Sequence, residues 1–404
     1  MYAIKLELKL NNKERTLMAR HSGYARFCYN YALNLYQEVK SLPGGSSKKV
    51  AAIERIFTNH VKKMPEYQWT NTLSSRVYKM TFRHFSEALS RFFKGLGEFP
   101  KFKRKKDGDS FTVDAADWNH SVLLAANKSI KIPTLGKFRL KESIPFPCVA
   151  QTFTISRTAD KWYVSFAIKA EKIPPMFHPV TEPVGIDLGV STFATISDGN
   201  SYESPRPLTQ AKTKLSKAQW RNRKKQLGNR KLGVRASKNA IIHYRRIAKI
   251  HAKTANVRRD FLQKTTTEIS QKYAHIRIED LNVSGMIANH KLAAAISDCG
   301  FYEFRRQLTY KTEMYGTKVE LVDRWFPSSK TCSNCGHVQS MPLKERVFNC
   351  GGCNLLINRD LNAAINLSRC SEKVRLAQSE VTPVDKKEST PLVEAGSEHQ
   401  ICRR

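Results

Sequence analysis

No run in the sequence approaches the roughly 20 consecutive apolar residues that a membrane-spanning helix needs. The opening segment, MYAIKLELKL, lacks the apolar core of a signal peptide. A disulfide framework is not expected either, because nine cysteines is an odd number and four of them have a spacing typical of a metal site. These absences favour a reduced, cytoplasmic protein with no membrane segment.

Acidic residues are also scarce. The chain has 35 Asp and Glu against 69 Lys and Arg, which gives a formal net charge of +34. A protein this basic is expected to meet a polyanion, and nucleic acid is the first candidate. An anionic membrane surface is the alternative, although the sequence has no basic amphipathic helix with a continuous apolar face. The 404 residues are enough for about two to four domains.

The first part of the chain has strand patterns on both sides of a helical stretch. Residues 2–10 alternate as a strand, and residues 13–93 are mainly helical. The last helix of this stretch is expected to bury Leu73, Val77, Met80, Phe85, Leu89 and Phe92. Further strand-like runs follow at residues 129–133, 137–140, 152–157 and 161–170.

This order predicts a multidomain protein of α/β and β-barrel class. The N-terminal β-barrel would comprise residues 1–12 and 98–175, interrupted by a helical insertion at residues 13–97. A proline-rich linker at residues 176–183 would close this half of the chain.

Two segments concentrate basic residues. The run FPKFKRKK at residues 99–106 mixes cations with aromatic rings, a composition that suits phosphates and bases. Residues 211–260 contain 17 Lys or Arg and one acid, and Gly228 and Gly233 indicate a turn between two helices. Such runs are most often solvated faces. Here, however, the many positive charges would repel one another unless an anionic partner were bound. The candidate nucleic-acid contacts here are Lys101, Lys103, Arg104, Arg221, Arg223, Lys224, Lys225, Arg245 and Arg246.

Four cysteines form two Cys-x-x-Cys pairs separated by 14 residues. Glycines follow the first pair and lie inside the second, so each pair can occupy a tight turn. Two such pairs supply the tetrahedral thiolate set of a structural zinc ion, and we predict a zinc ribbon at residues 331–353. Two unrelated reduced turns are the alternative, whereas a redox site would need only one pair. The predicted zinc ligands are Cys332, Cys335, Cys350 and Cys353.

Three acids stand out by position. Asp187 lies mid-strand between glycines in VGIDLGV, and Glu279 ends a strand at residues 275–281. Asp360 lies in the first turn of a helix that Asn358 is expected to cap, a place where an acid is often simply favourable with the helix dipole. If the fold brings the three together, two Mg²⁺ ions would relieve their repulsion, as in RNase H-like nucleases. The apolar face of the last helix is expected to run through Leu361, Ala364, Ile365 and Ser368.

The ordered series GIDLGV, IEDLNVSGM, ISDCGFYEFRRQLTYK, SSKTCSNCG, CGGC and NRDLNAAINL resembles the TnpB family of transposon-encoded relatives of type V CRISPR effectors. The similarity extends over residues 184–370 and is weaker but collinear at FPKFKRKK and around residues 25–30. On the family pattern, Asp187, Glu279 and Asp360 match the three carboxylates of the RuvC nuclease domain. The four cysteines match the family's zinc ribbon.

The resemblance implies a RuvC-like RNase H-fold domain, residues 184–330 and 354–370, with the zinc ribbon inserted. It implies an Mg²⁺-dependent DNA endonuclease whose partners are a guide RNA from the transposon end and double-stranded target DNA, cut beside a short motif. Such a protein would be found in the prokaryotic cytosol and at the nucleoid. In the family the barrel and its helical insertion handle the motif and the seed duplex, and the matching helix here carries Ser75, Arg76 and Lys79.

Three other functions stay open at this stage. An RNA-guided repressor would bind DNA without cutting, but the intact acids count against it. A structure-selective RuvC resolvase would need neither the zinc ribbon nor the N-terminal half. A transposase or accessory transposition protein would join strands, although no tyrosine-based site is evident. The residues after Cys370, 371–404, are rich in Ser, Glu and Pro and are predicted to be a disordered tail.

Overall fold

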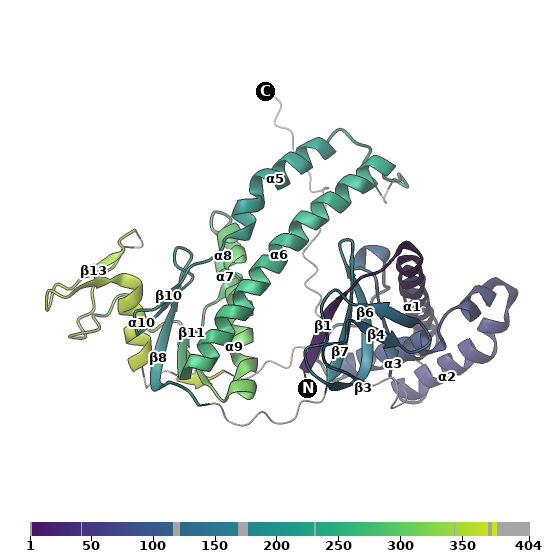
Figure 1. The fold of residues 1–404 in the computed structure, drawn as a ribbon, viewed down its shortest axis with the longest axis horizontal. Helices are drawn as coiled ribbons and strands as arrows, with labels where there is room; N and C mark the ends of the chain where they lie inside the picture. Colours follow the sequence, from purple (N-terminus) through teal and green to yellow (C-terminus); the bar gives the residue numbers. More distant parts are fainter. Residues whose placement is uncertain are drawn as a thin grey trace. The chain divides into compact units, whose positions relative to one another are not determined.

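The protein is described here from a computed structural model that covers residues 2–41, 43–115, 122–168, 177–229, 232–342, 344–370 and 374–377. The chain divides into two compact units, Met1–Glu171 and Lys172–Arg404, and each is described by itself (Figure 1). Within the described residues, no helix is both long enough and apolar enough to cross a membrane.

The first unit is built on an antiparallel half-barrel sheet. Its strand order is β1-β7-β6-β2, so the first strand of the chain pairs with a strand from the end of the unit, as the sequence pattern predicts. β3 adds to β6, and β4 and β5 form a separate hairpin. The strands are β1 (Tyr2–Leu8), β2 (Ser110–Asp114), β3 (Val122–Leu123), β4 (Ser129–Ile132), β5 (Gly136–Arg139), β6 (Cys148–Thr158) and β7 (Lys161–Ile168).

Three helices pack with this sheet around one apolar core. They are α1 (Asn12–Val39), α2 (Ser46–Asn59) and α3 (Ser75–Phe93). α1 begins with a capping box, in which Asn11 and Glu14 exchange side-chain hydrogen bonds with each other's backbone N–H. The predicted residues are buried, Leu73 just before α3 and the others within it, except Phe92, which is 36% exposed and contacts Phe93 and Phe99 edge-on. The prediction for Phe92 is wrong because the last turn of α3 extends beyond the core.

The second unit contains a six-stranded sheet in the order β10-β9-β8-β11-β12-β15. β10, β9 and β8 are antiparallel neighbours, whereas β8, β11 and β12 run parallel. β8 starts inside the segment expected as a linker, and residue 176 of that segment lies outside the described residues. The strands are β8 (Val180–Leu188), β9 (Ala194–Ile196), β10 (Ser201–Tyr202), β11 (Tyr273–Glu279), β12 (Lys318–Val322) and β15 (Val374–Leu376).

β15 corrects the prediction that residues 371–404 are a disordered tail. Val374–Leu376 pairs antiparallel with β12, because the outer edge of β12 offers backbone groups that a further strand can satisfy. Residues 371–373 and 378–404 lie outside the described part of the chain.

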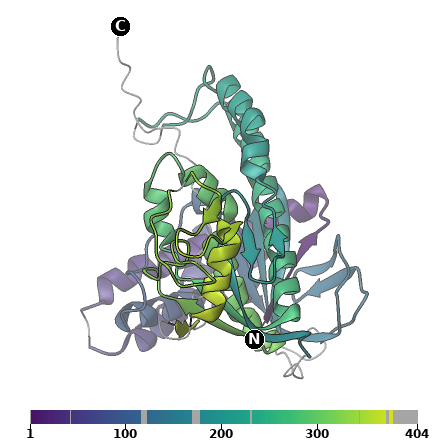
Figure 2. The ribbon, with the colours of Figure 1, turned by 90° about the vertical axis from the view of Figure 1, so that its left-hand side faces the viewer.

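Helices lie on both faces of this sheet (Figures 1 and 2). Leu262 and Phe304, from α6 and α9, join Ile186 and Ile278 of the strands in one core, so these two helices cover one face. α10 covers the opposite face, beside β8. The helices are α5 (Pro207–Asn222), α6 (Lys238–Lys272), α7 (Val283–Ala288), α8 (Ala293–Cys299), α9 (Phe301–Tyr315) and α10 (Arg359–Arg369), and a small hairpin of β13 (Val347–Asn349) and β14 (Leu356–Asn358) precedes α10.

A single glycine separates α8 from α9, and Ser297 lies inside α8. Gly300, at φ +74°, ends α8 and serves as the N-cap of α9. The left-handed conformation of Gly300 places the boundary between the two helices there.

α10 lies against β8 at a position where only glycine fits. A Cβ atom on Gly185 would collide with the carbonyl oxygen of Ala364 and would lie 2.5 Å from the backbone nitrogen of Ser368. It would also lie 2.8 Å from the Cβ of Leu367. The contact is backbone against backbone, so neither side can rotate out of the way, and Gly185 fixes how closely α10 approaches the sheet.

We predict that Gly185→Ala loosens α10. Overpacking costs about 1–3 kcal/mol, and more when the obstructing atoms belong to the backbone. Hydrogen exchange at the amides of α10 should therefore become faster. Gly23→Ala is the matched control, because a Cβ on Gly23 meets nothing within 4 Å and alanine favours the surrounding helix. Unchanged exchange in α10 of the Gly185 variant would contradict this account of the packing.

Candidate active site and metal centre

Two of the predicted acids lie side by side on neighbouring parallel strands. β8 and β11 pair in register up to Ile186 and Ile278, so Asp187 and Glu279 are the next residues on each strand. Neighbouring strands are about 4.8 Å apart. Because Ile186 and Ile278 are buried in the core, the acids alternate onto the other face, the one covered by α10.

Asp360 reaches the same place from α10. Asn358 caps this helix as predicted, and its side-chain oxygen accepts a 2.9 Å hydrogen bond from the Asp360 N–H. Asp360 is one helical turn, about 6 Å, before Ala364, and Asp187 is two strand residues, about 7 Å, beyond Gly185. Ala364 lies against Gly185, and the charge of Asp360 acts on Asp187. Asp360 on the helix and Asp187 on the strand therefore lie at about the same height along the sheet.

The charges of Asp360 and Glu279 act on Asp187. Burial, followed by the negative charges of Asp360 and Glu279, raises the pKa of Asp187 to about 7, while Arg359 opposes the shift. Burial and the charge of Asp280 raise the pKa of Glu279. Like charges held this close favour the binding of cations, and oxygen ligands suit Mg²⁺. In the described part of the chain the four cysteines are the one group of three or more potential metal ligands whose ligand atoms all lie within 4.8 Å, so the three carboxylates do not all lie that close together.

A basic side chain approaches the acids from the segment that precedes β13. The Nη1 of Arg346 lies 4.0 Å from the Oδ1 of Asp360, and its Nη2 donates a 3.0 Å hydrogen bond to the Ser191 hydroxyl. Arg346 thereby connects α10 with the loop that follows β8. Sequence reasoning did not select Arg346, because nothing in its local pattern distinguishes it from the other basic residues.

The opposite end of α10 is held by a buried ion pair. Arg277 of β11 donates from Nε to Glu320 of β12 at 2.8 Å and from Nη1 to the carbonyl oxygen of Ser368 at 2.6 Å. A cation at the C-terminal end of a helix also complements the helix dipole. Glycine packing and this ion pair therefore hold α10 on the sheet with Asp360 directed toward the two strand acids.

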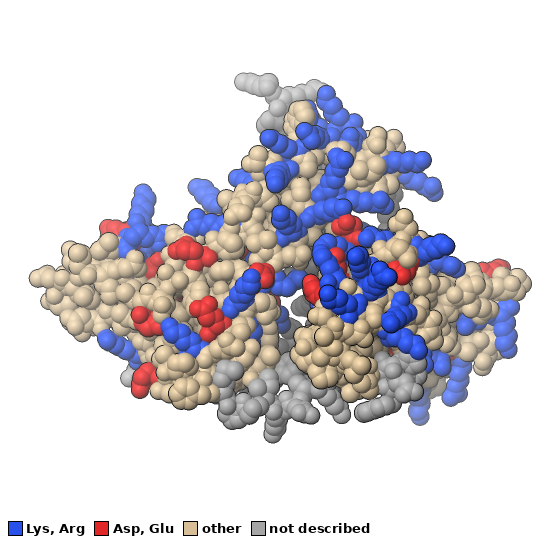
Figure 3. Space-filling model, in the orientation of Figure 1, with Lys and Arg blue, Asp and Glu red and all other residues tan. Residues whose placement is uncertain are grey.

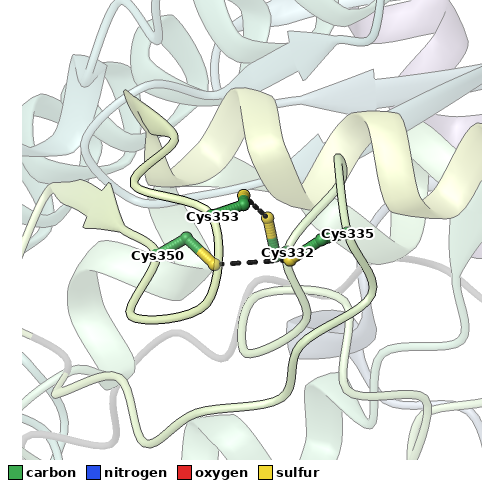
Figure 4. A group of neighbouring side chains, drawn as sticks. All are labelled: Cys332, Cys335, Cys350 and Cys353. Carbon is green, nitrogen blue, oxygen red and sulfur yellow. Dashed lines mark hydrogen bonds between the residues drawn. The ribbon is translucent and has the colours of Figure 1, made fainter.

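The four predicted zinc ligands converge on one centre (Figure 4). The sulfur atoms of Cys332 and Cys353 are 3.6 Å apart, as are those of Cys335 and Cys350. A tetrahedral zinc ion with Zn–S bonds of about 2.3 Å needs sulfurs about 3.8 Å apart. The structure therefore confirms the cluster, and its chemistry and spacing fit zinc.

Donor groups around the sulfurs favour the thiolate form that zinc binds. The backbone N–H groups of Asn334 and Gly352 donate to Cys332 and Cys350 at 3.4 and 3.3 Å. The Asn334 side chain donates to Cys353 and is the main cause of a lowered pKa at that thiol. These hydrogen bonds stabilise negative charge on sulfur.

Two buried asparagines join the zinc ribbon to α10. The Asn362 amide donates to the Thr331 carbonyl at 2.7 Å and accepts from the Ser333 N–H at 2.9 Å, on either side of Cys332. The Asn366 amide donates to the Ser328 carbonyl at 2.8 Å. The first cysteine turn is therefore attached to the helix that carries Asp360.

This arrangement corrects the predicted face of the helix. Leu361, Ile365 and Ser368 are only half-buried, and the fully buried side consists of Asn362, Ala363, Ala364, Asn366 and Leu367. The apolar pattern misleads here because the helix packs against backbone carbonyls of the ribbon, which require amide partners.

The predicted nucleic-acid contacts in the first unit lie on two segments. Ser75 and Lys79 are exposed in the first turns of α3, whereas Arg76 is half-buried and pairs with Asp114 at 3.2 Å. In the second segment Lys101, Lys103 and Arg104 are exposed. The backbone around Lys103 is held to α1, because Asn30 accepts from its N–H at 2.7 Å and donates to its carbonyl at 2.9 Å.

The remaining predicted contacts lie on the helical hairpin formed by α5 and α6. Lys and Arg side chains crowd over this hairpin (Figure 3). Arg221, Arg223, Lys224, Arg245 and Arg246 are exposed, and Lys225 is half-buried. Trp220 is 62% exposed, and the Arg223 guanidinium stacks 3.5 Å from its ring centroid. The hairpin thus offers cations together with an aromatic face.

Comparisons with known proteins agree with this architecture. Models described as a "Cas12f1-like, TNB domain" and a "Probable transposase" match residues 301–367 and 165–290. A "Helix-turn-helix domain" model matches residues 1–39, which fold here as β1 and the single helix α1. The Cas12f1 chain in the "Cryo-EM structure of the Cas12f1-sgRNA-target DNA complex" aligns with a TM-score of 0.53 at 16% identity, over 90% of this chain and 83% of that one. The fold is therefore that of the Cas12-type effectors.

Two curated bacterial proteins are similar over nearly their whole length. A "Putative RNA-guided DNA endonuclease" of Streptomyces pristinaespiralis is 31% identical, with 92% of each chain covered. "Putative RNA-guided DNA endonuclease InsQ" of Escherichia coli K12 is also 31% identical, over 98% of this chain and 99% of that protein. The chain belongs to the TnpB family.

We predict that zinc in the ribbon keeps α10 in place. Cys335→Ser should lower the zinc content from one ion per chain and should speed hydrogen exchange in α10, because the cysteine turn is bonded to Asn362 and Asn366. Cys148→Ser is the control, because Cys148 is a half-buried cysteine of the other unit. This variant should retain both its zinc and the slow hydrogen exchange of α10. Loss of zinc with no change in α10 would show that the two are uncoupled.

The raised pKa of Asp187 predicts that divalent cations bind with release of protons. Below about pH 7 this carboxyl is largely protonated in the metal-free protein, so Mg²⁺ must displace a proton to bind. Mg²⁺ affinity should therefore rise with pH between about pH 6 and pH 8 and level off above that range. Calorimetry in buffers of different ionisation enthalpy measures the protons released. An affinity that is flat with pH would contradict the assigned pKa.

Proposed function

We propose that the protein is an RNA-guided, Mg²⁺-dependent DNA endonuclease of a transposable element. The observation that carries the proposal is that Asp187 lies buried within reach of the charges of Glu279 and Asp360, in a chain whose net charge is +34. The negative charges of Asp360 and Glu279 add to burial in raising the pKa of Asp187, and bound cations would offset that repulsion. The names of the full-length relatives support the RNA guide and the DNA substrate.

The three acids would hold two divalent ions at the sheet edge. Such a pair, about 3.5–4 Å apart, activates a water and stabilises the leaving oxygen of a phosphodiester. Asp187 and Glu279, on paired strands, would fix one side of the site, and Asp360 would close it from α10. Arg346, 4.0 Å from Asp360, adds a positive charge where a substrate phosphate would lie.

The remaining elements supply the path for nucleic acid. The sheet of the second unit together with α10 would be the RuvC-like RNase H domain, with the zinc ribbon inserted before its last helix. The α5–α6 hairpin, with its exposed arginines and Trp220, suits a phosphate backbone and unpaired bases. Ser75, Arg76, Lys79 and the segment around Lys103 would bind nucleic acid in the first unit. The bacterial relatives support residence in the cytosol, at the nucleoid when bound to DNA.

We predict that Asp187→Ala abolishes cleavage and leaves binding intact. The substitution removes a metal ligand, so the rate should fall by at least about a hundredfold. It also removes a negative charge that repels phosphate, so the variant should retain its guide RNA and bind matched DNA at least as tightly as wild type. Gel shift and cleavage should be measured on one guide-loaded preparation in Mg²⁺.

Asp260→Ala is the matched control. Asp260 is an exposed acid on α6 that pairs only at the surface with Lys264, so its loss should change neither reaction. Cleavage by the Asp187 variant, or loss of RNA and DNA binding together with cleavage, would refute the assigned site. Absence of cleavage in the wild type with tight guided binding would favour the RNA-guided repressor instead.

A further inference from the structure

A pocket opens one residue beyond Glu279, on the side of the sheet opposite α10. It has a volume of about 380 Å³ and is lined by the end of β11, the start of α7, the first turns of α9 and the segment after β12. This volume is within the roughly 300–1,000 Å³ typical of ligand sites. Its position at the carboxyl ends of parallel strands is where open α/β sheets usually bind ligands.

Two arginines converge in this pocket. Asp280 is buried and accepts from Arg305 at 2.6 Å and from Arg324 at 3.0 Å. Each guanidinium has five N–H donors, so the bond to Asp280 holds it at the pocket wall and leaves donors beyond that bond. Because two cations meet one carboxylate, the lining retains a positive charge that suits a phosphate.

Aromatic rings lie beside these cations. Tyr302 lines the pocket with 42% of its surface exposed, and the Arg305 guanidinium lies 5.9 Å from its ring centroid. Trp325, the residue after Arg324, is 83% exposed although its backbone is fixed by a 2.8 Å bond from its N–H to Asp323. An exposed ring next to a phosphate-binding cation is the arrangement that holds an unpaired nucleotide.

We infer that this pocket binds one nucleotide of single-stranded DNA next to the bond that is cut. The phosphate would contact Arg305 and Arg324, and the base would stack on Tyr302, the aromatic residue that lines the pocket. The inference rests on the proposed function, because it takes the acids as the cutting site. The acids and the pocket lie on opposite faces but at the same carboxyl end of β11, and Glu279 and Asp280 are consecutive residues, so a strand that crosses this end of the sheet would reach both. The pocket would thus set which bond of the strand meets the acids.

Photo-crosslinking tests the contact without cleavage. Full-length Asp187→Ala protein is irradiated with a short single-stranded DNA that carries 5-iodouracil, and the linked residue is identified by mass spectrometry. The expected link is to Tyr302. Links only to other aromatic residues, or links formed exclusively with an RNA oligonucleotide of the same sequence, would overturn the assignment.

Variants of Tyr302 supply the second measurement. Because stacking contributes about 1–3 kcal/mol per base, Tyr302→Ala should weaken binding of the single-stranded DNA by about 5- to 150-fold. Tyr302→Phe keeps the ring and should restore binding. In the cleaving wild-type background, Tyr302→Ala should also spread the cut over neighbouring bonds, an effect that a loss of stability would not produce.

Phe177→Ala is the matched control, since Phe177 is 86% exposed just before the amino end of β8, whereas the pocket lies at the carboxyl end of the parallel strands. It should leave affinity and cut position unchanged. Equal affinities for the Tyr302 variants and wild type would refute the pocket. A wild-type protein that forms the expected crosslink but does not cut would refute the proposed endonuclease and retain the pocket.

Discussion

The backbone of α10 lies so close to β8 that residue 185 has room for no side chain. This single contact sets the geometry of the second unit. It places the first turn of the helix level with Asp187, and Arg277 holds the other end through the Ser368 carbonyl. Asn362 and Asn366 then attach the zinc ribbon to the same helix. The position of the first cysteine turn, the docking of the helix and the placement of Asp360 are therefore linked through α10.

The charges at this site determine what it can bind. The chain is strongly basic, yet it concentrates three acids at one sheet edge and raises the pKa of Asp187 to about 7 by burying it beside the other two. The surrounding positive charge attracts a polyanion, while the acids repel it unless cations intervene. Such a site would be switched on by metal and would contact the substrate strand only where the cations lie.

Much of the candidate site could be predicted from the sequence because its signals are local. Two Cys-x-x-Cys pairs, an aspartate between glycines and an asparagine cap each depend on a few neighbouring residues. The features that were missed depend on contacts between distant segments. β15 exists because β12 offers an edge, and Asn362 is buried because the ribbon presents carbonyl groups to it. The spacing of apolar residues cannot predict a helix face that is buried against backbone carbonyl groups, because that face carries asparagine side chains.

The most direct test is a crystal structure of the protein soaked in Mn²⁺, with data collected to locate manganese by anomalous scattering. We predict two peaks about 3.5–4 Å apart, enclosed by the carboxylates of Asp187, Glu279 and Asp360. Both peaks should disappear in Asp187→Ala, while the zinc signal at the four cysteines persists. Manganese bound elsewhere, or three acids that remain apart without metal between them, would contradict the account.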